Sequence, residues 1–185
     1  MGKLSSFTFI TLNGFFKGEK EDTSWHNHSN EAGKFANEAS QSDSILLFGR
    51  KTYELMYSFW PTPAAHELFP VVAENMNKAT KLVCSNTMKK AEWKNTSIIS
   101  GDIVEQIRNL KQTGRKEITI LGSGSLITQL TNAGLIDQYT IMLDPIAIGK
   151  GTSVFAGIQQ QLNLKLVSSR VFKEDGILVL TYEPA

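Results

Sequence analysis

The segment that most constrains the fold is a short apolar run that ends in a glycine and two cations, residues 45–53 (ILLFGRKTY). Its apolar part is too short for a helix and lies between Asp43 and Gly49, so it predicts a buried strand. Gly49 permits a sharp turn, and residues 51–59 can form a helix behind it. Because the first amides of a helix have no internal partners and its dipole favours negative charge there, this arrangement predicts an anion site, most plausibly for phosphate. An ordinary strand-to-helix corner with solvated basic residues explains the same segment equally well.

A second segment, residues 121–126 (LGSGSL), repeats this logic. Gly122 and Gly124 have no side chains to block a diphosphate, and the serines between and after them add hydroxyl groups. An ordinary tight turn is again the competing interpretation. A third polar stretch, residues 85–87 (SNT), follows the expected strand at 81–84. In a parallel sheet all three stretches lie at the carboxyl ends of strands, where open α/β sheets bind ligands.

The order of the expected elements predicts the fold class. Strands and helices alternate through the first two thirds of the chain, which favours a parallel sheet with helices on both faces. Residues 138–148, 162–172 and 177–182 then look like strands without helices between them, and residues 173–176 (KEDG) predict a hairpin turn. We therefore expect an α/β fold with a mixed, mostly parallel sheet and antiparallel C-terminal strands, in one domain that spans residues 1–185.

Composition excludes several classes of protein. The formal net charge is +1, so there is no general electrostatic case for binding nucleic acid or an anionic membrane. The one cysteine excludes an internal disulfide framework and suits a reducing compartment. No apolar run is long enough to span a bilayer, so the sequence predicts a cytoplasmic protein.

Aromatic and histidine side chains offer further candidates. Trp25 and Trp60 could form an aromatic wall for a flat substrate, or they could be partly buried core residues. His26 and His28 flank a single residue in a polar loop, but no third ligand lies at ligand spacing, so we expect no metal site.

Several modest motifs occur in a fixed order along almost the whole chain: residues 11–14 (TLNG), 47–53 (LFGRKTY), 59–61 (FWP), 81–85 (KLVCS), 120–124 (ILGSG), 135–137 (LID) and 145–155 (PIAIGKGTSVF). Together they resemble the dihydrofolate reductase superfamily. The resemblance is strongest to the branch that contains the reductase domain of the bifunctional riboflavin-biosynthesis deaminase/reductase and its stand-alone bacterial homologues.

The resemblance implies an NADPH-dependent reductase with a dihydrofolate reductase-like three-layer fold. Its substrate would be a small heterocycle or an imine-type compound, as for 5-amino-6-(5-phosphoribosylamino)uracil reductase of riboflavin biosynthesis or dihydrofolate reductase. Members of this branch often pair through C-terminal strands, which implies a homodimer. By analogy, the cofactor-binding residues would be Leu12, Asn13 and Gly14 at the nicotinamide, Gly49, Arg50, Lys51 and Thr52 at the diphosphate, Ser85, Asn86 and Thr87 at the adenosine ribose and its 2′-phosphate, and Gly122, Ser123, Gly124, Ser125 and Leu126 on the other side of the diphosphate.

The chain also departs from this pattern. Dihydrofolate reductases carry a carboxylate on the first helix that assists protonation of the pterin, and an ungapped count reaches Gly33 instead. The nearest carboxylates are Glu31 and Asp22. Glu31 is the candidate catalytic residue, although it could be only a helix-start acid. Asn13 stands where the riboflavin branch usually has an aspartate. An alternative function is therefore a non-catalytic nucleotide-binding module, kept as a sensor or resistance factor.

Overall fold

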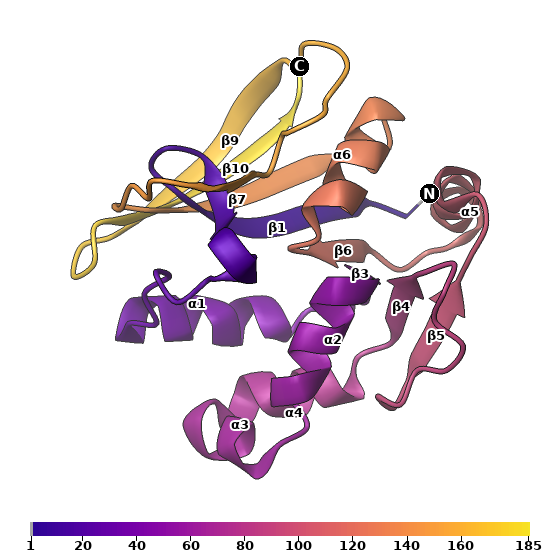
Figure 1. Ribbon diagram of the computed structural model, residues 1–185, viewed down its shortest axis with the longest axis horizontal. Helices are drawn as coiled ribbons and strands as arrows, with labels where there is room; N and C mark the ends of the chain where they lie inside the picture. The colour runs from indigo at the N-terminus through magenta and orange to yellow at the C-terminus, as the bar shows by residue number, and fades with distance from the viewer. Residues whose placement is uncertain (1) are drawn as a thin grey trace.

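The computed structural model describes residues 2–185. It contains one large sheet whose strands come from the whole length of the chain (Figure 1). The strands lie in the order β5 (Thr96–Ile99), β4 (Lys81–Cys84), β3 (Ile45–Gly49), β6 (Ile118–Leu121), β1 (Leu4–Thr11), β7 (Gln138–Asp144), β10 (Ile177–Pro184) and β9 (Leu164–Phe172). The two yellow strands β9 and β10 form one edge in Figure 1, and β5 forms the other.

The sheet is mixed, as the sequence predicts. The strands from β5 to β7 run parallel to their neighbours, whereas β10 runs antiparallel to both β7 and β9. The expected fold class is therefore confirmed, with one refinement: the first of the three C-terminal strands, β7, belongs to the parallel part because it pairs with β1. The hairpin turn at 173–176 joins β9 to β10, and Gly176 adopts the left-handed φ of +70° that the turn requires.

Helices cover both faces of the sheet. One face carries α1 (Asn30–Ser40), α2 (Arg50–Phe59), α3 (Pro63–Leu68) and α4 (Pro70–Lys78), and the other carries α5 (Ile103–Thr113) and α6 (Gly124–Asn132). The helices α3 and α4 are separate, because Phe69 leaves helical geometry and Pro70 starts a new helix. Within residues 2–185 no helix has the length and apolar character needed to cross a membrane.

The alternation of side chains along β3 divides the core into two layers. Leu47 is fully buried against Ile107 of α5 and Leu130 of α6. Its neighbour Phe48 is fully buried on the opposite face, in a cluster with Tyr53 of α2. A strand with apolar residues on both faces must be covered on both, and that requirement places β3 in the middle of the fold.

A small two-stranded sheet lies apart from the main one. β2 (Phe15–Gly18) pairs antiparallel with β8 (Gly151–Ser153), and a short 3₁₀ helix, Glu19–Glu21, follows β2. The sequence did not predict these strands, because each is only a few residues long and their partners are far apart along the chain. The pairing places Phe16 and Lys17 beside the large cavity described next.

Candidate functional site

A cavity of about 1950 Å³ lies along the carboxyl ends of β4, β3, β6 and β1. Three loops that follow these strands contribute to its wall: residues 49–52, 85–86 and 122–126. Trp60 also lines it. The structure therefore brings together most of the residues that the resemblance assigned to a cofactor.

The turns after β3 and β6 are joined by a hydrogen bond. The backbone N–H of Gly49 donates to the Ser123 side-chain oxygen at 2.9 Å. Gly122 and Ser123 both have left-handed φ angles, 57° and 58°, so the chain turns tightly before α6 starts at Gly124. Successive residues in such a turn direct backbone N–H groups outward, as in anion-binding loops.

The helices α2 and α6 differ from most of the others in their capping. Side chains of Ser29, Thr62 and Asp102 cap α1, α3 and α5. No side chain caps α2 or α6, whose first residues line the cavity. Their leading amides are therefore free to bind a negatively charged ligand, and both helix dipoles favour one.

The cations at this end of the cavity are paired with carboxylates. Arg50 donates to Glu54 at 2.8 Å, and Lys51 donates to Glu21 at 3.2 Å. Hydrogen bonds from Lys17 and Lys51 lower the pKa of the Glu21 carboxyl. All of these side chains are solvent-accessible, so the pairs are weak and an incoming phosphate can compete for the cations.

The adenosine residues proposed from the resemblance lie at the next strand end. Ser85 and Asn86 line the cavity, whereas the exposed Thr87 does not. The Ser85 Oγ accepts from the Met88 N–H at 3.0 Å, and the Asn86 Oδ1 accepts from the Gly101 N–H at 2.7 Å. Those bonds fix the loop and leave the serine hydroxyl hydrogen and the asparagine NH₂ for a ligand.

Residues 12–14 have a different position from the one expected, because they do not line the cavity. The Asn13 Nδ2 donates to the Ile148 carbonyl at 2.8 Å, and the Leu12 N–H donates to the Ile146 carbonyl at 2.7 Å. Leu12 is 65% exposed. This segment therefore anchors the loop after β7, and Phe9 and Phe16 form the cavity wall near it.

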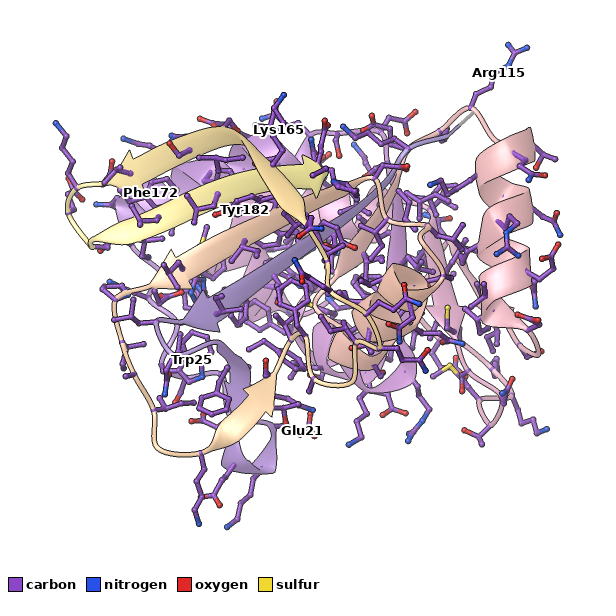
Figure 2. The ribbon with its side chains drawn as sticks, turned by 90° about the horizontal axis from the view of Figure 1, so that it is seen from above. Glu21, Trp25, Arg115, Lys165, Phe172 and Tyr182 are labelled. Carbon is purple, nitrogen blue, oxygen red and sulfur yellow. The ribbon has the colours of Figure 1, made fainter. Side chains whose placement is uncertain are left out.

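The remaining candidate residues do not all lie at the cavity. Trp60 lines it, but Trp25 does not. Trp25 packs edge-on against Phe9, with ring centroids 5.6 Å apart, beside the ends of β1 and β7 (Figure 2). Glu31 does not line the cavity either, and its Oε2 accepts from the Glu174 N–H at 3.1 Å. The geometry thus gives Glu31 the position of a helix-start acid that ties α1 to the β9–β10 hairpin.

The sequence singled out His26 but not its partner. His26, which lines the cavity, contacts Asp144 at the end of β7, with 2.9 Å between Nδ1 and Oδ2. The two residues are 118 positions apart, so no local pattern could have linked them. In residues 2–185 no group of three or more histidine, cysteine, aspartate or glutamate side chains is arranged to hold a metal ion.

Comparison with known proteins agrees with this fold. Among solved structures, a protein from Shewanella sp. PV-4 that is described as a riboflavin-biosynthesis protein aligns with a TM-score of 0.75 at 22% identity, covering 99% of each chain. Dihydrofolate reductase from Enterococcus faecalis, complexed with NADP(H) and RAB-propyl, aligns with a TM-score of 0.68 at 18% identity, covering 99% of this chain and 96% of that one. The fold is therefore the three-layer dihydrofolate reductase-like fold.

Sequence comparison places the chain more closely. It is 30% identical over 174 residues to the uncharacterized protein YyaP of Bacillus subtilis strain 168, covering 94% of this chain and 90% of the relative. The model of the RibD C-terminal domain matches residues 3–178. The chain belongs to the RibD C-terminal domain family.

Proposed function

We propose that this chain is an NADPH-dependent reductase of a small heterocyclic or imine-type substrate. The observation that carries the proposal is the pair of uncapped helix starts, α2 and α6, that meet at one cavity and are joined by the Gly49–Ser123 hydrogen bond. Two converging sets of free amides with Arg50 and Lys51 beside them suit a diphosphate. Membership of the RibD C-terminal domain family supports a reductase role.

We expect the cofactor to be held chiefly through its diphosphate and its adenosine half. The α2 start with Arg50 and Lys51 would hold the diphosphate from one side, and residues 122–126 would hold it from the other. Ser85 and Asn86 would donate to the adenosine ribose and its phosphate. When bound, the reduced nicotinamide supplies the hydride, and the protein supplies orientation and exclusion of water.

The other end of the cavity indicates the kind of substrate. On the α1 side it is lined by small and apolar residues: Ala32, Gly33, Phe35, Ala36, Ala39 and Ser40. No carboxylate of α1 lines the described cavity. The lysines and the arginine that line the cavity all lie near the turns after β3 and β6 that we propose for the phosphates. This lining favours a flat, uncharged acceptor over a substrate that is held by its own phosphate or by a carboxylate. The missing carboxylate is also what favours the alternative, a nucleotide-binding module without catalysis.

Fluorescence titration of the pure protein with NADPH and with NADH tests the cofactor. We expect tighter binding of NADPH, because the cations and hydroxyls suit an additional phosphate; equal or tighter NADH binding would contradict this. NADPH oxidation is then followed with 7,8-dihydrofolate, 7,8-dihydrobiopterin and 5-amino-6-(5-phosphoribosylamino)uracil. NADPH binding without oxidation of the cofactor by any of these or related acceptors would favour the binding module.

A further inference from the structure

His26 and Asp144 form a buried acid–base pair at the cavity. Their side chains are only 8% and 2% exposed, and the His26 Nδ1 lies 3.1 Å and 2.9 Å from the two carboxylate oxygens. Asp144 is the last residue of β7, so a strand of the central sheet holds it. A histidine oriented by a buried carboxylate is a common element of catalytic sites, because the carboxylate fixes the ring and stabilises the imidazolium.

The surroundings hold the ring in one orientation. Phe9 stacks on His26 with ring centroids 4.2 Å apart and planes 3° from parallel, and Trp25 meets the same ring edge-on at 6.3 Å. The Asn27 N–H donates to Asp144 at 3.2 Å, and the Asn27 side chain donates to Asp175 at 2.9 Å. Trp25, which does not line the cavity, therefore contacts it only through neighbours such as His26.

The hydrogen bond to Asp144 determines which nitrogen faces the ligand. Because Nδ1 lies against the carboxylate, it carries a proton. The Nε2 has no hydrogen-bond partner among residues 2–185, and His26 lines the cavity. A bound molecule is thus the natural partner of Nε2.

Few other groups in the cavity can transfer a proton. The charged residues that line it are Lys17, Glu21, Arg50, Lys51 and Glu54, and all belong to the ion pairs near the phosphate turns. His28, whose ring centroid lies 4.9 Å from that of His26, has no carboxylate in contact. Partial burial, and then the neighbouring His26, lower the pKa of His28. Asp144 and His28 are the titratable groups in contact with His26 in the described chain.

We propose that His26 is the proton donor of the reduction and that Asp144 is its positioning residue. The inference rests on the proposed reductase function and extends it. The hydride adds to the carbon of a C=N or C=O bond. The Nε2–H bond of the imidazolium breaks, and its proton goes to the nitrogen or oxygen of that bond. The double bond thereby becomes one C–H bond and one N–H or O–H bond, the cofactor is left oxidised, and neutral His26 takes a new proton from solvent.

NMR of the imidazole nitrogens tests the pair in the protein itself. The chain has three histidines, so the variants His26→Gln, His28→Gln and His66→Gln assign the spectrum. We expect neutral His26 in the Nδ1–H form, the minor tautomer of free imidazole, and we expect Asp144→Asn to change that form. With NADP⁺ and 7,8-dihydrobiopterin bound, the His26 Nε2 resonance should shift. An Nε2–H tautomer, or an Nε2 resonance that the two probes leave unchanged, overturns the proposal.

Single-turnover oxidation of NADPH by 7,8-dihydrobiopterin tests the chemistry. The wild-type rate should fall as pH rises, because only the protonated imidazole can act as the general acid. His26→Gln should be about 100-fold slower at low pH and should lose the pH dependence, because a glutamine cannot donate a proton from that position as a general acid. Asp144→Asn should be slowed by a smaller factor than His26→Gln and should shift the pH profile of the rate. His66→Gln, on α3 outside the cavity, is the matched control and should behave like the wild type.

The outcomes separate the two proposals. No NADPH binding by the wild type rejects both. NADPH binding with unchanged rate and pH profile in His26→Gln rejects the role of His26 alone. If the wild type binds NADPH but reduces no acceptor, the tautomer and the Nε2 shift decide the role of His26.

Discussion

The backbone N–H of Gly49 donates to the Ser123 Oγ at 2.9 Å and thereby joins the turns after two neighbouring strands, β3 and β6. Ser123 is 6% exposed, so the bond is shielded from water. The Oγ also lies 3.3 Å from the Leu121 carbonyl, to which it donates. The two turns are consequently held at a fixed separation by the protein itself.

Ser123→Ala should lower the free energy of unfolding by about 1–3 kcal/mol, because it leaves the Gly49 amide without its partner. It should also weaken NADPH binding, since the two turns are no longer joined. Urea unfolding and cofactor titration measure both effects. Ser97→Ala, at an exposed position on β5, is the control and should change stability by less than about 0.5 kcal/mol. An unchanged stability of Ser123→Ala would contradict the role of this bond.

Arg50→Ala should weaken NADPH binding by about 1.5–3 kcal/mol if the guanidinium makes a charged hydrogen bond to phosphate. Glu54→Gln should instead strengthen NADPH binding, because Glu54 competes with the phosphate for Arg50. Arg108→Ala removes a similar exposed arginine, paired with Glu105 on α5 and outside the cavity, and should leave affinity unchanged. Fluorescence titration distinguishes these results from a general effect of charge.

Glu31→Gln separates the two roles that the sequence left open. Glu31 lies in the first turn of α1 and does not line the cavity. Its carboxylate accepts a hydrogen bond from the Glu174 N–H. We expect a loss of about 0.3–1 kcal/mol of stability from the lost charge at the helix start, with turnover and NADPH affinity unchanged. A selective fall in turnover, with the melting temperature preserved, would restore Glu31 as a catalytic residue.

Gly124→Ala should destabilise the protein by about 1–3 kcal/mol through overcrowding. A Cβ at this position would lie 2.6 Å from the Cζ of Phe16, which must move and disturb the wall of the cavity. Gly33→Ala is the matched comparison, because nothing lies within 4 Å of its Cβ position inside α1. That change should stabilise the protein by about 0.5–1 kcal/mol. Thermal melts of the two variants should therefore move in opposite directions.

We propose a homodimer that forms through β9, the C-terminal edge of the sheet (Figure 2). Leu166, Val167 and Val171 are 50%, 52% and 55% exposed on this strand, and an exposed apolar edge favours association. Light scattering should give the mass of two chains, and Leu166→Glu should shift it toward one. A wild-type monomer at micromolar concentration would exclude this assembly.

The sequence by itself determined most of the helices and strands and the two glycine-containing turns at one end of the cavity. Glycine, cations and apolar runs act within a few residues, so residues 45–53 and 121–126 could be assigned as strand, turn and helix start from local chemistry. Because β3 and β6 are parallel neighbours, their carboxyl ends necessarily meet at one edge. Local reasoning failed where two short strands pair over a long separation, as β2 and β8 do.

Only the tertiary structure decided which residues line the other end of the cavity. Residues 12–14 carry a family motif, yet their side chains and amides bond to the loop after β7. Trp25 and Trp60 were equivalent substrate candidates in the sequence and Glu31 was the catalytic candidate, and packing brought only Trp60 to the cavity wall. His26 acquired its partner because β7 lies beside β1 in the sheet, which brings Asp144 to the segment that leads into α1. Such a pair depends on strand order, and strand order is set by burial of whole faces rather than by any local sequence signal.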